Sequence, residues 1–233
     1  MIFFKTKKVG GTSFEIALSK YCDENDIVTP ISPYDEDTRA NLGYQGPINY
    51  KNQNRSKKLV SLGITGEFRN HLTASEIRQN IGNEIFSKSI KISIHRDPLD
   101  FIVSLYWMQK TGNNKKFNDL SFREWLAIQY HTVEDNYKIA PISGPNSPDI
   151  ILNYATLVDD IKKVSEFPRD FLETFSSISA KGNRRPSSAK DPIKFLQDND
   201  CEDYIPKIIE LSNKARHFQT SLIDKLKSTL SFW

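Results

Sequence analysis

The chain has 233 residues, of which 38% are hydrophobic and 11% aromatic, a composition typical of one globular domain with a substantial core. Its formal net charge is only +3, so the overall charge gives no reason to expect nucleic acid as a partner, and any anion site must be local. There is no run of about 18 apolar residues, which predicts no membrane span. We therefore expect a single domain over residues 1–233 and a cytoplasmic location.

Short apolar runs predict the strands, and helical spacing predicts the helices. The predicted strands are residues 2–7, 58–64, 90–94 and 150–154. Apolar residues at helical spacing predict a helix over residues 12–21, and one or two helices in the last forty residues, from Ile205 to Leu226. Strands that alternate with helices indicate an α/β fold with a mainly parallel sheet covered by helices on both faces.

Helix starts and loops are indicated by other local signals. Thr73 with Glu76, and Ser121 with Glu124, have the spacing of a capping box, in which a hydroxyl and a glutamate satisfy each other's free backbone donors. Residues 30–57 and 141–148 are rich in Pro, Asn and Gly and show little periodicity, which predicts surface loops. Cys22 and Cys201 have no metal-ligand spacing, so we expect two reduced thiols and no metal.

The stretch KTKKVGGTSFE at residues 5–15 lies between the first predicted strand and the first predicted helix. A sharp turn through Gly10 and Gly11 leaves the first backbone N–H groups of the helix pointing outward, which forms an anion site together with Thr12, Ser13 and the charge of Lys8. A tight turn that needs glycine only for its conformation is the alternative interpretation. The lysine precedes the glycines, so this is not a Walker motif.

A second candidate anion site follows the strand predicted at residues 90–94, in the stretch ISIHRDPLDFIVSLYW at residues 92–107. Arg96 stands at the strand end, Pro98 is at the natural first-turn position of a helix, and Ser104 lies eight residues after Arg96. Arginine suits phosphate oxygens because its guanidinium is a planar fork of donors. A local salt-bridged turn and a solvated helix serine are the alternative interpretation.

Together, these two stretches resemble the sulfotransferases that use 3′-phosphoadenosine 5′-phosphosulfate (PAPS), of the bacterial and phage type related to carbohydrate and uronyl O-sulfotransferases. In that family a Pro-Lys-Thr-Gly-Gly-Thr-Ser type loop follows the first strand. The resemblance implies that Lys8 is the catalytic lysine and that Gly10, Gly11, Thr12 and Ser13 hold the 5′-phosphosulfate. It also implies that Arg96 and Ser104 bind the 3′-phosphate. Lys7 replaces the usual proline and adds a possible second cation, whereas Val9 replaces a threonine and loses a possible hydroxyl contact.

The same resemblance sharpens the expected fold and the expected reaction. It implies a single domain with a central parallel sheet of about five strands flanked by helices, similar to P-loop nucleotide kinases, with the cofactor at the carboxyl ends of the strands. The expected activity is transfer of a sulfuryl group from PAPS to a hydroxyl of a saccharide or another small acceptor. Adenosine 3′,5′-bisphosphate is the product, and no metal is expected.

The transfer needs a base, for which His71 is the leading candidate because histidine titrates near working pH. His71 lies in HLTASEI, which is similar to a segment of the bacterial and phage-type relatives, and related uronyl sulfotransferases use a histidine base. Glu67 is the second candidate, because other sulfotransferases use a glutamate there. A surface histidine flanking a helix is the alternative interpretation.

Two further stretches resemble family elements less closely. Arg184 and Arg185 lie in a basic loop at residues 181–192, and the resemblance suggests that they close over the 3′-phosphate, although a solvated loop fits equally well. In NYATL at residues 153–157, Ala155 replaces an acidic residue of the family. The aromatic residues Tyr106, Trp107, Trp125 and Tyr130 either line a sugar site or belong to the core, and we prefer the core.

Two other functions remain open at this stage. A nucleotide kinase of related fold needs a lysine after the glycines and carboxylates for magnesium, which we do not find in the sequence. A non-catalytic module that binds a nucleotide or carbohydrate is the other, because a fold alone does not determine chemistry.

Overall fold

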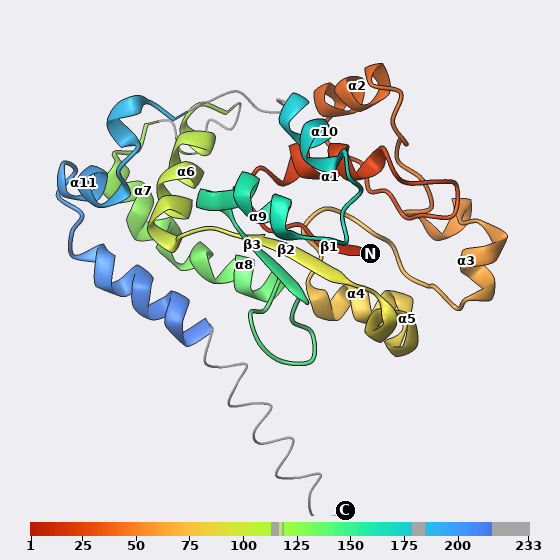
Figure 1. The fold of residues 1–233 in the computed structure, drawn as a ribbon. Helices are drawn as coiled ribbons and strands as arrows, with labels where there is room; N and C mark the ends of the chain where they lie inside the picture. The colour runs from red at the N-terminus through yellow and green to blue at the C-terminus, as the bar shows by residue number, and fades with distance from the viewer. Residues whose placement is uncertain (113–116, 118, 179–184, 216–233) are drawn as a thin grey trace, which may run out of the picture.

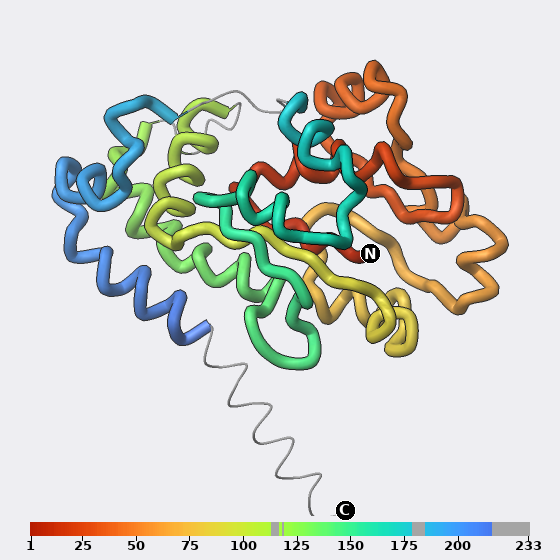
Figure 2. Tube along the Cα trace, viewed as in Figure 1, coloured from red at the N-terminus to blue at the C-terminus, as the bar shows by residue number. Residues whose placement is uncertain are grey.

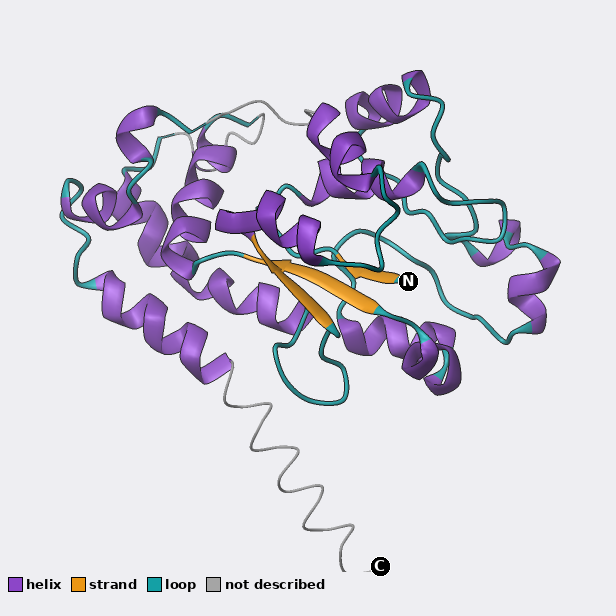
Figure 3. Cartoon of the chain, viewed as in Figure 1, coloured by secondary structure: helices purple, strands orange, loops and turns teal. Residues whose placement is uncertain are grey.

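Three parallel strands form the centre of the fold in the computed structural model, with helices packed around them (Figure 3). The structure describes residues 1–112, 117, 119–178 and 185–215. The strands are β1 (Ile2–Phe4), β2 (Lys91–His95) and β3 (Ile150–Asn153), in the spatial order β1-β2-β3. Ile2 pairs with Lys91, and Ile92 pairs with Ile150. The described residues therefore form one α/β domain.

Each strand is followed along the chain by a group of helices (Figure 1). Those before β2 are α1 (Gly11–Ser19), α2 (Pro33–Asn41), α3 (Lys57–Ser61), α4 (Ala74–Ile81) and α5 (Asn83–Lys88). Those after β2 are α6 (Pro98–Lys110), α7 (Phe122–Gln129), α8 (Glu134–Ile139), α9 (Leu157–Lys163), α10 (Phe171–Ser177) and α11 (Pro192–Gln197). Residues 204–215 are also helical.

Alternate residues of β1 pack on opposite faces of the sheet. Phe3 packs with α1, α9 and α10, in a cluster that includes Phe14, Ile92, Leu152 and Phe171. Phe4 faces the other way, into a cluster formed with α3, α4 and α5. Because strand side chains point alternately to the two faces, helices cover both sides of the sheet, as Figure 2 shows for the chain trace.

A third apolar cluster lies beyond the carboxyl ends of the strands (Figure 1). It joins α6, α7, α11 and the helix at residues 204–215 around the fully buried ring of Trp125. Tyr106 is also buried there, and Trp107 and Tyr130 pack against the cluster. The prediction of a core position is confirmed for Tyr106 and Trp125, whereas Trp107 and Tyr130 are only partly buried.

The strand predicted at residues 58–64 is wrong, because residues 57–61 form α3. The Ser56 side chain accepts a hydrogen bond from the Leu59 backbone N–H and so starts a helix. Leu59 and Ile64 are buried, but Val60 and Leu62 are more than half exposed, so the run is not buried continuously as a central strand would be. Gly63, with φ +74°, then ends the helix.

The loop predicted at residues 30–57 is also partly wrong, because it contains α2. Ser32 caps this helix, Pro33 is in its first turn, and acidic residues follow, so the helix signals were local and not periodic. Only Asp35 and Arg39 of α2 are buried, which explains why no apolar pattern marks it. The described residues contain three strands, whereas the family resemblance implied about five.

The strand predicted at residues 2–7 ends at Phe4, and the other predicted elements agree with the structure. Strands form close to residues 90–94 and 150–154, and both capping boxes are present at the starts of α4 and α7. The helix predicted over residues 12–21 is observed as Gly11–Ser19. Residues 141–148 form no helix or strand, as predicted for a loop. The part of the C-terminal prediction that includes Leu226 lies outside the described residues.

Two properties concern the described part of the chain as a whole. None of its helices combines the length and apolar character that are needed to cross a membrane. In the same residues, no group of three or more His, Cys, Asp or Glu side chains is placed to hold a metal ion. Cys22 and Cys201 are free thiols, which agrees with the sequence prediction.

Candidate active site at the carboxyl edge of the sheet

The carboxyl ends of the three strands lie at one edge of the sheet, because the strands are parallel. The chain leaves β1 through residues 5–10, leaves β2 through Arg96 and Asp97, and leaves β3 through Tyr154. The Thr6 hydroxyl donates a hydrogen bond to the Ile94 carbonyl, which attaches the first of these loops to the end of β2. Open α/β sheets bind ligands at this edge.

The loop after β1 leads into α1 through residues with left-handed backbone conformation. Lys8 has φ +62° and Gly10 has φ +71°, and Gly10 is the residue that precedes the first turn of α1. No side-chain hydrogen bond caps α1, and its first turn holds no acidic residue. Because the first N–H groups of a helix have no acceptor within it, residues 11–13 direct backbone donors and the positive end of the helix dipole toward the sheet edge.

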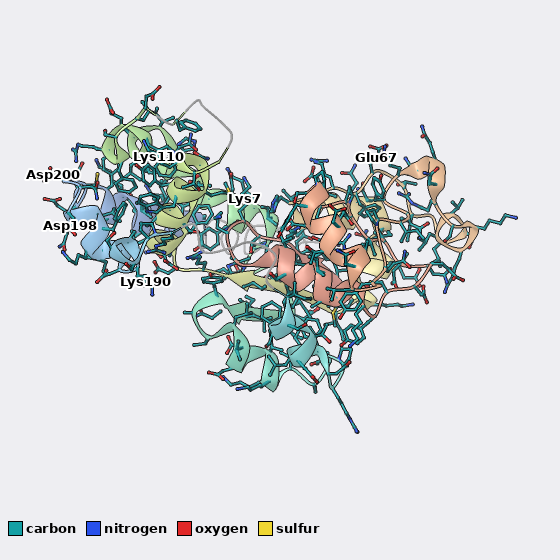
Figure 4. The ribbon with its side chains drawn as sticks, turned by 90° about the horizontal axis from the view of Figure 1, so that it is seen from above. Lys7, Glu67, Lys110, Lys190, Asp198 and Asp200 are labelled. Atoms are coloured by element: carbon teal, nitrogen blue, oxygen red, sulfur yellow. The ribbon has the colours of Figure 1, made fainter. Side chains whose placement is uncertain are left out.

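The two departures from the family pattern have different structural consequences. Val9 is fully buried in the cluster under α1, so its side chain belongs to the core. Lys7 is held by α8: its Nζ pairs with Asp135 at 2.8 Å, and its backbone N–H and carbonyl both bond to the Asn136 side chain. Figure 4 shows Lys7 near the middle of the molecule. Its charge is therefore balanced by Asp135, and it is a poor second cation for a bound anion.

Arg96 connects the loops after β1, β2 and β3. Its Nη1 donates to the Lys8 carbonyl at 2.5 Å, and its guanidinium carbon lies 4.1 Å from the centre of the Tyr154 ring. The same Tyr154 ring would lie 3.9 Å from a Cβ placed on Gly10. Two segments 88 positions apart in the sequence therefore meet at one place.

Asp100, in the first turn of α6, bonds to two arginines at once. Its carboxylate accepts from Arg96 Nε at 2.6 Å and forms an ion pair with Arg185. Burial tends to raise the pKa of Asp100, but the hydrogen bonds from the two guanidinium groups outweigh it and lower the pKa below the usual value. Asp100 is therefore ionised at neutral pH, and it orients both arginines.

The other residues that were predicted to bind the 3′-phosphate are Ser104, Arg184 and Arg185. Ser104 is half-buried on α6, four residues after Asp100, so these two positions share one helix face, whereas Arg96 precedes the helix. Arg185 belongs to this group through Asp100, and its side chain also donates to the Ala189 and Lys190 carbonyls. Arg184 lies outside the described residues.

His71 lies beside the loop after β1. Its Nδ1 is 2.7 Å from the Lys5 carbonyl, and since a carbonyl only accepts, Nδ1 carries the proton and the neutral ring has its lone pair on Nε2. The residue reaches the surface, but desolvation of the ring lowers its pKa below the usual value near 6.5, and the hydrogen bond to Lys5 opposes this only in part. His71 also has a left-handed backbone, with φ +63°.

Glu67 is placed differently from His71. It is exposed, and the contact that involves it is made by its backbone carbonyl, which accepts from Asn80 Nδ2 at 3.2 Å. In Figure 4 it lies well away from Lys7, over the part of the molecule built from the segments before β2. The structure therefore brings His71, and not Glu67, to the loop that contains Lys8.

Two residues of the site were not identified from the sequence. Asp100 had one available signal, because an aspartate four residues after an arginine on a helix is a common ion pair. Tyr154 lies in NYATL, which resembles a family element at a strand end, but the sequence analysis gave it no role. Comparison with known protein families, with curated proteins and with solved structures finds no match to this chain.

Proposed function

We propose that this chain is a PAPS-dependent sulfotransferase that transfers a sulfuryl group to a hydroxyl of a small acceptor, a saccharide or another alcohol. The observation that supports this most directly is the hydrogen bond from Arg96 to the Lys8 carbonyl. It brings a helix N-terminus and an arginine together at the carboxyl edge of a parallel sheet. PAPS carries an anionic group at each of two positions of one nucleotide. The helix N-terminus and the arginine could each bind one of these anionic groups.

Each residue has a separate role in this proposal. The backbone donors of residues 11–13 and the charge of Lys8 bind the 5′-phosphosulfate. Arg96 and Ser104 bind the 3′-phosphate. The bonds to Lys8 and Asp100 use two of the five N–H donors of the Arg96 guanidinium, and a phosphate takes others. Asp100 is a positioning residue, because it holds Arg96 and Arg185 in place.

The reaction requires one proton transfer and one stabilised leaving group. PAPS supplies an activated sulfuryl group. The hydroxyl oxygen of the acceptor forms a bond to sulfur while the bond from sulfur to the bridging phosphate oxygen breaks, and the hydroxyl proton passes to Nε2 of His71. Lys8 and the N-terminus of α1 stabilise the negative charge that develops on the bridging oxygen.

Thermal unfolding with nucleotides tests this proposal. Adenosine 3′,5′-bisphosphate at about 100 times its dissociation constant should raise the free energy of unfolding by roughly 2.7 kcal/mol, because it binds only the folded chain. ATP with magnesium should have a much smaller effect. Stabilisation by ATP and magnesium but not by the bisphosphate would favour a nucleotide kinase and refute the proposal. Stabilisation by the bisphosphate without turnover of PAPS, for any hydroxyl acceptor, would leave a non-catalytic binding module.

The role of His71 predicts the pH dependence of the reaction. Because its pKa is below the usual value near 6.5, the ring loses its proton at a lower pH than an ordinary histidine does. We therefore expect kcat/KM to rise with pH to a plateau, with the midpoint of the rise below about 6.5. Steady-state rates measured between about pH 5 and pH 8 test this.

Two substitutions separate the two candidate bases. His71→Gln should lower kcat by about 10²- to 10⁴-fold and remove the rise with pH. Glu67→Gln should change kcat by less than about twofold, because its side chain is exposed and apart from the loop that contains Lys8. The opposite pattern would assign the base to Glu67.

A further inference from the structure

A cavity of about 320 Å³ lies beside β1, at the edge of that strand that is not paired with β2. Its walls come from β1, from α1 and residues 22–29 after it, and from the segment that runs through α3, α4 and α5. Its volume is close to the lower end of the range of small-molecule sites in proteins. The nucleotide site lies at the carboxyl ends of the strands, and the cavity extends along β1 instead.

The cavity exists because no strand forms on that side of β1 in the described part of the chain. Residues 58–64 were predicted to be a strand, but residues 57–61 form α3. Helices and loops cross the edge of the sheet and leave a space between them. Just over half of its lining residues are apolar, including Phe3, Leu18, Ile27, Phe68, Ile77 and Ile81, and the others are polar or charged.

One group of polar lining residues is joined by hydrogen bonds, and we call this group the polar end of the cavity. The Lys5 ammonium donates to Asn70 Oδ1 at 2.7 Å and forms an ion pair with Glu15. Glu15 also accepts from the Thr29 hydroxyl at 2.7 Å. His71 lines the same end and is bonded to the Lys5 carbonyl. The polar end therefore contains the proposed base.

The polar end is next to the proposed site of transfer. Lys5 is three residues before Lys8, and a Cβ placed on Gly11 would lie 3.1 Å from Lys5 Cγ. The Lys5 side chain therefore runs past the first turn of α1, where the phosphosulfate is proposed to bind. A molecule that fills the cavity presents its polar end to His71 and to that turn.

We infer that this cavity binds the apolar part of the sulfuryl acceptor, which makes the acceptor a compact hydrophobic alcohol or phenol and not a saccharide. The inference rests on the proposed function and narrows its substrate class. A saccharide carries hydroxyl groups around its ring, and those that face the aliphatic and aromatic part of the wall find no hydrogen-bond partners there, so their burial is costly. An alcohol with one hydroxyl and an apolar body can place the hydroxyl at the polar end and the body against the aliphatic and aromatic residues.

Equilibrium binding of two probes tests the inference on the full chain with saturating adenosine 3′,5′-bisphosphate. We expect 2-naphthol to bind, and methyl glucoside not to bind, in isothermal titration calorimetry. Ile77→Phe fills part of the cavity and should weaken 2-naphthol binding by about tenfold or more, because overpacking of a filled site is unfavourable. Ile193→Phe, on the exposed surface of α11, is the matched control and should leave binding unchanged.

A second measurement on the unaltered chain covers the case in which Ile77→Phe does not fold. With isoleucine and leucine methyl groups labelled, nuclear Overhauser effects should connect the naphthol ring to the methyl groups of Ile77, Ile81 and Leu18. Binding of methyl glucoside, no binding of 2-naphthol, or naphthol contacts elsewhere would overturn the inference. Failure of the bisphosphate to bind refutes the proposed function instead, and naphthol contacts with Ile77 would still identify the cavity as an apolar ligand site.

Discussion

Replacing Lys8 with alanine should lower kcat for sulfuryl transfer by about 10²- to 10³-fold and weaken adenosine 3′,5′-bisphosphate binding by only about tenfold or less. The larger effect falls on kcat because the charge of Lys8 is needed most as the bridging oxygen becomes negative. Alanine retains a Cβ, so the variant keeps the backbone strain of a residue at φ +62°. The decrease in kcat therefore reports the removal of the ammonium group. Single-turnover transfer from labelled PAPS measures the rate, and calorimetry measures the binding.

Lys162→Ala is the matched control for Lys8→Ala. Lys162 lies on α9, is more than half exposed and pairs with Asp159 at 3.0 Å, so its removal should leave both rate and binding within about twofold of the original values. Equal losses of rate in the two variants would show that Lys8 has no special role. A loss of binding with no change in kcat at saturation would make Lys8 a binding residue only.

Replacing Arg96 with alanine should weaken binding of adenosine 3′,5′-bisphosphate by about 10- to 100-fold, the usual value for hydrogen bonds to a charged group. It should leave binding of adenosine 5′-monophosphate, which lacks the 3′-phosphate, nearly unchanged. Arg96→Lys should restore little, because an ammonium cannot reproduce the fork that bonds to Lys8 and Asp100 together. Calorimetry with both nucleotides measures the difference.

Arg96→Ala also removes one of two arginines from the half-buried Asp100 carboxylate, so we expect a lower free energy of unfolding, by about 1–3 kcal/mol. Arg123→Ala is the control, because Arg123 is half exposed and pairs with Asp203 on the surface. An equal loss of affinity for the 5′-monophosphate and the bisphosphate would exclude Arg96 from the 3′-phosphate site. Denaturant unfolding without nucleotide separates the loss of stability from the loss of binding.

The parts of the fold that sequence predicted are those that short-range patterns determine. β2 is a continuous run of buried residues, and the capping boxes of α4 and α7 depend on residues three apart, so both are visible in the chain. α3 was mistaken for a strand because its short apolar run satisfies either period, and the Ser56 cap decided the outcome. α2 is almost entirely polar, so periodicity gave no signal for it.

In the candidate site, too, some features could be predicted from local sequence and others depend on contacts between distant segments. The glycine turn before α1 and Arg96 at the end of β2 follow from local sequence, and so does the proposal that each binds an anion. That Lys7 would be neutralised by Asp135 on α8, and that Tyr154 would stack on Arg96, depends on contacts between distant segments. The cavity beside β1 depends on the absence of a strand there, which no local pattern reports.

The pairing of β1 with β2 determines when the site after β1 can form during folding. β1 has only three residues, and the strand with which it pairs begins at Lys91. β1 is therefore not stable until β2 has been added. Closing so long a segment is slow compared with forming the helices between them. The proposed nucleotide site thus forms late in folding, and in a chain that still lacks residues 91–96 the loop after β1 has no Arg96 to bond to.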